Sequence, residues 1–432
     1  MNRRVFLVAI LSLAVGLVYA QEPPPVNYDE NKVEPYSLED PLVYCNGRKV
    51  RKKADWPERR AEILDIFQRE MYGQLPPKPD TVLLETMDEG LSLAGHARRR
   101  QVKMSFRSDG GGPSIDWLIL TPEFAKEPVP VVMLLNYEGN HTVVPDNEVF
   151  VPDLPLLQYK DGRQASSFPR GALSNPSAAS VLPVGMLLAR GYAVVTACYE
   201  QIGPDPYPGT DQDSIACSRG VFGLWGKRDP SRKDNTSSLM AWAWGLMRGM
   251  DMVVRTPYLD ASRVLVTGAS RLGKAALIAG AFDDRFAVVV PNQTGGGGAP
   301  LSKRRFGENV GTEILNYTHW YCRAYDKYAE HEKDMPFDQH LLLACIAPRP
   351  LMVQGFDELW FDTKGEFLAL KAASPVWDFL GKKGLPGVDW PDDYDRSAIG
   401  PYLAYYRRPL GHGIAAIDWQ WMLDFAAPYL ER

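Results

Sequence analysis

The sequence predicts an α/β protein in which a central, mostly parallel sheet is covered by helices on both faces, a three-layer sandwich. Two observations support this. Short apolar runs rich in β-branched residues recur along the chain, and longer stretches with helical spacing lie between several of them. Parallel strands buried on both faces are typically continuous apolar runs. The expected strands are 117–120, 131–135, 193–197, 264–267, 286–290 and 351–354.

The expected helices and loops divide the chain into a lead and one large domain. The helical stretches are 56–72, 237–256, 274–281 and 417–429. Residues 21–100 begin with a proline-rich run and are interpreted as an N-terminal lead segment packed on one α/β domain of residues 101–432. Segment 203–234 is rich in Pro, Gly and Asp, and connections of this length are often functional. It is expected to wall a site at the carboxyl ends of the strands.

The first 20 residues have the pattern of a signal peptide. Arg3 and Arg4 precede an uncharged apolar run, 5–18, and small residues lead to a cleavage point after Ala20. A membrane anchor is the alternative, but the run is shorter than the roughly 20 residues that span a bilayer. We therefore expect an exported protein, periplasmic or secreted, without stable membrane insertion.

Charge and cysteine content narrow the possible partners. The net charge is −5 and the basic residues are scattered, which argues against nucleic acid binding. The five cysteines show no metal-ligand spacing, so no metal site is expected. In an exported chain an odd count leaves at least one cysteine unpaired, and Cys198 and Cys217 could pair.

The segment around Ser270 predicts a nucleophile. A strand at 263–267, a turn with Ser270 at its apex and a helix from Lys274 form the elbow typical of the α/β-hydrolase fold. Gly268 and Gly273 supply the small neighbours that such a turn needs, although the second glycine is one residue later than in the common pattern. The alternative is a serine that caps the following helix. Arg271 could add a donor for a developing oxyanion.

A serine nucleophile needs a base and usually an acid, which follow in the order Ser, acid, His. Of the histidines after Ser270, only His412 lies in a glycine-flanked turn between the last expected strand and the C-terminal helix, whereas His331 and His340 are interpreted as solvated. The loop after 350–354 carries the candidate acids. They are Asp357, Glu358 and Asp362.

Several motifs taken together resemble the glucuronoyl esterases, carbohydrate esterase family 15, and most closely the bacterial members. The family signature Gly-Cys-Ser-Arg-x-Gly-Lys is similar to residues 268–274, and the resemblance covers about residues 40–432. Further matches are 135–142 (LNYEGNHT), 241–245 (AWAWG), 302–308 (SKRRFGE), 359–367 (LWFDTKGEF), 411–412 (GH) and 418–419 (DW).

The resemblance implies a role for each site residue. Ser270 would be the nucleophile, His412 the base, and Arg271 the side chain that stabilises the oxyanion. The residues that would hold the glucuronate ring or line its pocket are Lys274, Glu308, Trp360, His319 and Trp320.

Two positions depart from the family pattern. Ala269 and Gly413 replace the two cysteines that fungal members join in a disulfide. Gln293 stands where many members carry the catalytic Glu, and an amide supplies no negative charge to an imidazolium. The acid is therefore assigned to Glu358, the position used by some bacterial members, with Asp357 in reserve; Gln293 would hydrogen-bond the histidine or the pocket.

The expected activity is hydrolysis of the ester between (4-O-methyl-)glucuronic acid of glucuronoxylan and lignin alcohols, through an acyl-enzyme and without metal or organic cofactor. A monomer is expected. An acetylxylan or other carbohydrate esterase is one alternative, and a catalytically inactive carbohydrate-binding homologue is another. The six apolar strands, the elbow and the ordered motifs support the esterase.

Overall fold

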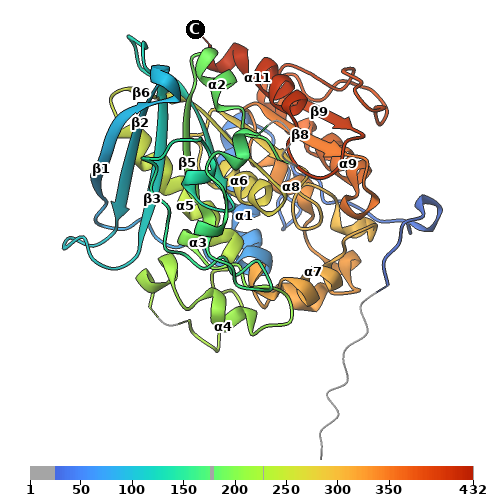
Figure 1. Cartoon of the computed structure of the whole chain (residues 1–432). Helices are drawn as coiled ribbons and strands as arrows, with labels where there is room; N and C mark the ends of the chain where they lie inside the picture. The colour runs from blue at the N-terminus through green and yellow to red at the C-terminus, as the bar shows by residue number, and fades with distance from the viewer. Residues whose placement is uncertain (1–24, 176–179, 227, 432) are drawn as a thin grey trace, which may run out of the picture.

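A nine-stranded sheet forms the centre of the described chain (Figure 1). The computed structural model describes residues 25–175, 180–226 and 228–431, so the expected signal peptide lies outside the described residues. The strand order is β1-β2-β3-β5-β4-β6-β7-β8-β9; the first three pairings are antiparallel and the remaining five are parallel. The bounds are β1 Leu83–Ser92, β2 Ala97–Ser105, β3 Ser114–Pro122, β4 Val129–Asn136, β5 Ala193–Cys198, β6 Leu259–Ala269, β7 Val288–Asn292, β8 Leu351–Phe356 and β9 Leu403–Arg408.

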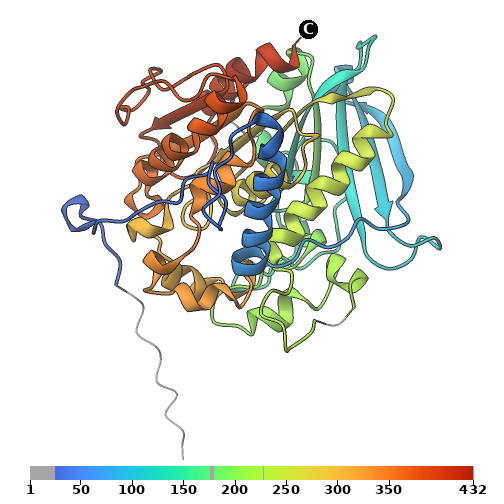
Figure 2. The same cartoon turned by 180° about the vertical axis from the view of Figure 1, so that it is seen from behind.

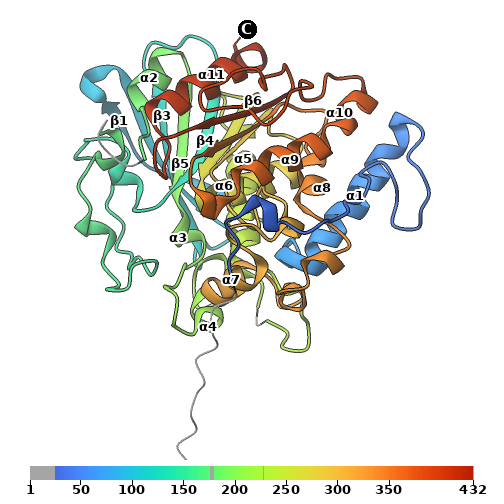
Figure 3. The ribbon, with the colours of Figure 1, turned by 90° about the vertical axis from the view of Figure 1, so that its right-hand side faces the viewer.

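Helices cover both faces of this sheet, as Figure 3 shows. Successive strand residues point to opposite faces, so Val131 and Met133 join one core while Val132 and Leu134 join the other. The first core is covered by α1 Trp56–Phe67, α5 Ser238–Val254, α6 Ser270–Phe282, α8 Gln339–Ala344 and α9 Thr363–Ala373, and the second by α2 Val184–Ala189 and α11 Ala416–Leu430. The remaining α-helices are α3 Tyr199–Ile202, α4 Gln212–Ala216, α7 Val310–Asn316 and α10 Pro375–Leu380.

All six expected strands are confirmed, but the sheet is larger than predicted. Strands β1, β2 and β9 were not expected, and β2 crosses residue 100, the expected boundary between lead and domain. Strand β2 is rich in arginine and lacks the alternation of apolar and polar residues typical of a strand. Ion pairs neutralise the arginines on its polar face. Arg99 contacts Asp88 at 2.8 Å and Asp146 at 2.6 Å. In β9 the buried Arg408 pairs with Asp418 at 2.8 Å.

The lead joins the domain on the face of α5 and α6. Helix α1 lies beside α8 in the rear view (Figure 2) and continues into a π-helical turn, Gln68–Tyr72. The interpretation of His340 as solvated is wrong. His340 is fully buried against the lead, and its Nε2 donates to the carbonyl of Glu39 at 2.7 Å. His331 is exposed, as expected.

Two further findings concern the cysteines and the membrane. All five cysteines are free, so the suggested Cys198–Cys217 disulfide is not formed. Cys198 instead lies with its Sγ 3.7 Å from the carbonyl of Tyr137. Within the described ranges, no helix combines the length and apolar character needed to cross a bilayer.

Candidate active site

Ser270 occupies the sharp turn between β6 and α6. β6 ends at Ala269, and Ser270 is the first residue of α6 with a backbone φ of +56°. A non-glycine residue at positive φ costs about 1–3 kcal/mol and persists only where surrounding structure enforces it. Ala269 is the N-cap and no side chain caps this helix terminus, so the capping interpretation of Ser270 does not apply.

The two glycines of the turn are required by close backbone packing. A Cβ at Gly268 would lie 2.4 Å from the carbonyl oxygen of Leu272, and one at Gly273 would lie 2.7 Å from that of Asn292. Both gaps are too short for any side chain. The later position of the second glycine therefore still fulfils the packing role of the elbow.

His412 lies in the turn between β9 and α11, with its ring beside two phenylalanines. The ring centroids of Phe361 and Phe356 are 4.7 and 5.4 Å from that of the imidazole. His412 Nδ1 is 3.1 Å from Oε1 of Gln293, a buried residue that directly follows β7.

The protons of this contact can be assigned from the backbone of Gly413. Gln293 Oε1 accepts from Gly413 N at 2.7 Å, and Gln293 Nε2 donates to Gly413 O at 3.0 Å. The amide orientation is fixed by these two bonds, so His412 Nδ1 must carry the proton that faces Oε1. The Nε2 atom is then the basic nitrogen, which is the tautomer that a serine nucleophile needs.

The imidazole is neutral over a wide pH range. Burial, followed by the positive charges of Arg271, Lys274 and Arg408, lowers the pKa of His412 to about 4. Within the described chain, no carboxylate is among the groups that shift this pKa.

The assignment of the acid to Glu358 differs from this geometry. Gln293 occupies Nδ1, whereas Asp357 and Glu358 both have exposed side chains. The turn at Leu359–Phe361 places the Phe361 ring against the imidazole, and the hydrogen-bonding position at Nδ1 is taken by Gln293, from the loop after β7.

Arg271 is held by a carboxylate that sequence reasoning missed. Asp205, from the long 203–234 loop, is almost fully buried and accepts hydrogen bonds from four side chains. The donors are Tyr199 Oη at 2.8 Å, His319 Nε2 at 2.7 Å, Trp320 Nε1 at 2.8 Å and Arg271 Nη1. Burial alone would raise the pKa of Asp205, but Arg271 and His319 lower it well below its usual range. Only the general expectation that this loop walls a site pointed to it.

Arg271 has a buried donor without a partner in the described chain. Its Nε is buried and, among the described residues, has no hydrogen-bond partner. A buried donor without a partner is costly, unless a ligand supplies the acceptor. Since the first N–H groups of α6 also lack intrahelical partners, both are suited to an oxyanion on a carbonyl attacked by Ser270.

Trp320 supports two cations next to Ser270. The Arg271 guanidinium carbon lies 5.0 Å from the Trp320 ring centroid and Lys274 Nζ lies 4.7 Å from it. Tyr317 stacks on the same indole at 3.8 Å. Trp320 is thus buried under the cations, whereas Trp360 remains partly exposed.

Lys274 and Glu308 form the polar end of this group. Lys274 Nζ is 3.7 Å from Glu308 Oε2, and Glu308 N donates to the carbonyl of Trp360 at 2.7 Å. Burial and the charge of Glu308 raise the pKa of the neighbouring Glu313 to about 8. Burial also raises the pKa of Glu308, and the charge of Lys274 beside it acts in the opposite direction. The structure thus brings together Ser270, Arg271, Lys274, Glu308, His319, Trp320, Gln293 and His412.

Comparison with known proteins identifies the family. A family model described as "Glucuronyl esterase, fungi" matches residues 186–381. The carbohydrate esterase MZ0003, from an unknown prokaryotic organism, is 36% identical over 418 residues, covering 95% of this chain and 93% of that protein. The chain belongs to the glucuronoyl esterases, carbohydrate esterase family 15.

Solved and curated members agree with this assignment. A glucuronoyl esterase from Solibacter usitatus superposes with a TM-score of 0.84 at 35% identity, covering 92% of this chain and 99% of that chain. The 4-O-methyl-glucuronoyl methylesterase of Schizophyllum commune is 28% identical over 84% of this chain and 80% of that protein. As a member of carbohydrate esterase family 15, the chain has the α/β-hydrolase fold and is a carboxylic ester hydrolase.

No cluster suited to a metal ion stands out at this site. Across the described ranges, no group of three or more His, Cys, Asp or Glu side chains could hold one.

Proposed function

We propose that this esterase hydrolyses the ester between the C6 carboxyl of (4-O-methyl-)glucuronic acid on glucuronoxylan and a lignin alcohol. One observation carries the proposal: Arg271 and Lys274, one and four residues after the elbow serine, both lie over the Trp320 ring, with Glu308 beside Lys274. Charged donors and a carboxylate acceptor beside a reacting carbonyl suit the ester of a hydroxyl-rich sugar. The name of the Schizophyllum commune relative, 4-O-methyl-glucuronoyl methylesterase, supports the same substrate.

The mechanism follows from the assigned protons. His412 Nε2 takes the Ser270 Oγ proton while Oγ attacks the C6 carbonyl, and Gln293 keeps Nδ1 protonated. The oxyanion is bound by the Arg271 backbone N–H and the free Nε. His412 then protonates the leaving alcohol. A water molecule, deprotonated by His412, releases the uronic acid and restores Ser270.

The remaining pocket residues bind and orient the sugar. Lys274 and Glu308 contact the hydroxyl groups of the glucuronate ring, and the partly exposed Trp360 covers one face. His319 and Trp320 support the pocket from beneath, because both donate a hydrogen bond to Asp205. The enzyme acts as an exported monomer, periplasmic or secreted, without cofactor.

A substrate panel with one pocket variant tests this function. The rates to compare are kcat/KM for benzyl glucuronate, benzyl galacturonate and benzyl acetate, in the parent and in Lys274→Met. The glucuronate ester should be preferred, and Lys274→Met should lower its kcat/KM by about 10- to 100-fold while changing acetate by less than about threefold. If Lys274→Met lowers kcat/KM equally for all three esters and leaves the melting temperature unchanged, the result would instead favour an esterase that does not recognise the glucuronate ring.

Labelling separates the enzyme from an inactive carbohydrate-binding protein. A serine-reactive phosphonate should label Ser270 in the parent and should fail to label His412→Ala at a comparable rate. Absence of labelling in the folded parent would favour the binding protein.

A further inference from the structure

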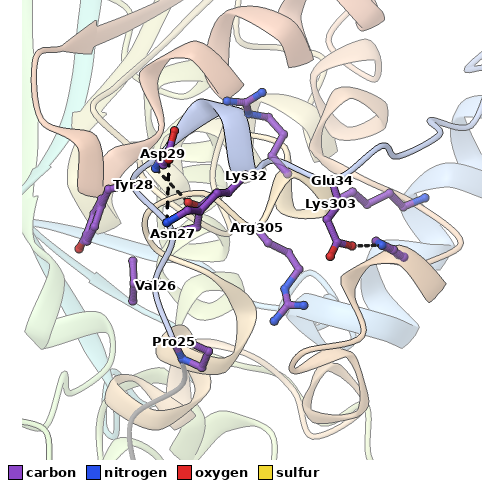
Figure 4. Close-up of a pocket in the computed structure, with 11 residues that line it drawn as sticks. Pro25, Val26, Asn27, Tyr28, Asp29, Lys32, Glu34, Lys303 and Arg305 are labelled. Carbon is purple, nitrogen blue, oxygen red and sulfur yellow. Dashed lines mark hydrogen bonds and ion pairs between the residues drawn. The ribbon is translucent and has the colours of Figure 1, made fainter.

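A cavity of about 490 Å³, separate from the candidate active site, lies between the N-terminal lead and the loop that precedes Glu308 (Figure 4). Its size is in the range of small-molecule sites, about 300–1,000 Å³. One wall is residues 25–34 of the lead and the opposite wall contains residues 303–305. The lining residues are Pro25, Val26, Asn27, Tyr28, Asp29, Lys32, Glu34, Lys303, Arg304, Arg305 and Lys333.

Five of these residues are basic and two are acidic, but only some of the cations are available to a ligand. Lys303 pairs with Glu39 at 2.6 Å and the buried Arg304 pairs with Asp362 at 2.8 Å, so both build the wall. Arg305 differs from these two residues because its terminal nitrogens remain available to a ligand.

Arg305 presents its guanidinium to the cavity. In the described chain its one ion pair is made through Nε, to Glu332 at 3.1 Å, and its two terminal nitrogens form no hydrogen bond. About a third of its side chain is exposed, and Figure 4 draws it between Asn27 and Glu34. Free, parallel N–H groups on an arginine are suited to bidentate binding of a carboxylate.

The backbone of Arg305 is also strained. Its φ is +48° and its ψ is 44°, in the left-handed region that a long side chain rarely adopts. Such strain costs about 1–3 kcal/mol and is concentrated at functional positions. Here it directs the last residue of the 302–305 turn toward the lead.

The cavity and the catalytic pocket share one loop. Arg305 and Glu308 are three residues apart, so their Cα atoms are separated by at most about 11 Å. Between them, Gly307 N donates to the carbonyl of Asn27 at 2.9 Å, which ties the lead to the loop that positions Glu308. Tyr28 is about half exposed, and partial burial, followed by the charge of the nearby Glu358, raises its pKa.

We propose that this cavity is a second subsite that binds another carboxylated sugar of the same polysaccharide. Arg305 takes the carboxylate, and Tyr28 offers a ring to the sugar face. Lys32, three quarters exposed and 3.9 Å from the Asp29 carboxylate, adds a second cation. The subsite rests on the proposed function, because its ligand is a second uronic acid branch of the chain whose ester is cleaved. It favours multiply substituted glucuronoxylan over singly substituted chains.

Binding to Ser270→Ala, measured by calorimetry, tests the subsite with three probes. These are xylo-oligosaccharides of equal length that carry two glucuronates, one glucuronate or none. The two-glucuronate probe should bind at least 10-fold more tightly than the one-glucuronate probe, because the second contact is intramolecular. Equal affinities for these two probes would overturn the proposal.

Variants assign the effect to the cavity. Arg305→Asn removes the charge and tolerates positive φ, so it should abolish the difference between the two acidic probes. Lys32→Gln, at an exposed position, should reduce the difference and keeps the test valid if Arg305→Asn unfolds. The matched control is Arg232→Met, at an exposed arginine outside the cavity, and it should change nothing. An undiminished difference in folded Arg305→Asn would contradict the proposal.

Hydrolysis of methyl glucuronate separates this inference from the proposed function. That ester has one uronate, so the cavity variants should leave its kcat/KM within about twofold of the parent. If the parent does not cleave it, the proposed function fails. If the parent cleaves it and the two acidic probes still bind equally, only the second subsite fails.

Discussion

Arg271 and His412, two side chains of the candidate active site, are held by partners that differ in charge. On the oxyanion side, Arg271 is fixed by Asp205, an ionised carboxylate that also binds His319, Trp320 and Tyr199. On the base side, His412 is fixed by the neutral amide of Gln293. Arg271, which must stay charged, thus has an anionic partner. His412, which must stay neutral, has an uncharged partner.

This difference has a catalytic consequence. In the proposed mechanism, Arg271 stabilises the developing oxyanion, whereas the charges of Arg271 and Lys274 disfavour an imidazolium at His412. A carboxylate at position 293 would offset that effect, and the amide does not. We therefore propose that the enzyme combines strong oxyanion stabilisation with a weak base that stays neutral in acid.

Removing the amide should have the largest effect. Gln293→Leu leaves Nδ1 of His412 without an acceptor and lets the ring turn, so kcat for methyl glucuronate should fall by about 10²- to 10³-fold. Steady-state kinetics with a melting curve measure this. Gln339→Leu, at another buried glutamine outside the site, is the control and should keep kcat within about threefold. A similar kcat in parent and Gln293→Leu would show that the amide does not orient the base.

Neutralising Asp205, the partner of Arg271, should have an intermediate effect on kcat. Asp205→Asn keeps the shape but removes the charge that holds Arg271, so kcat should fall by about 10- to 100-fold with a smaller change in KM. Asp213→Asn, in the same long loop and paired with Arg323, serves as the control. If KM rises and kcat is unchanged, Asp205 acts on sugar binding and not on the oxyanion side.

The smallest effect is expected for the acid suggested by family resemblance. Because Glu358 is exposed and does not contact His412 in the described structure, Glu358→Ala should change kcat/KM for methyl glucuronate by less than about threefold. A loss of 100-fold or more would show that Glu358 reaches His412 during turnover and that Gln293 is not its sole partner.

Local and distant features differ in how well the sequence predicts them. The six inner strands and the Ser270 elbow depend on neighbouring residues, so apolar runs and small turn residues predicted them. Strand β2 was missed because ion pairs with residues far along the chain, such as Asp146, neutralise its arginines.

Contacts between distant segments explain the remaining differences. The Asp205 site joins loops 66 and 114 residues apart in sequence, and no local pattern marks it. His340 seemed solvated because the lead that buries it is about 300 residues away. The acid was assigned to the loop after β8, and turn position alone does not reveal that Gln293 lies at Nδ1 of His412.

The pH dependence of kcat/KM tests the neutral base most directly. With methyl glucuronate as substrate, the parent should stay active down to an acid limb near pH 4, the pKa of His412, because activity is lost only as the imidazole gains a proton. In Gln293→Glu the carboxylate favours the imidazolium and should move this limb upward by at least one pH unit. A parent limb near pH 6.5, or the same limb in both proteins, would contradict the account.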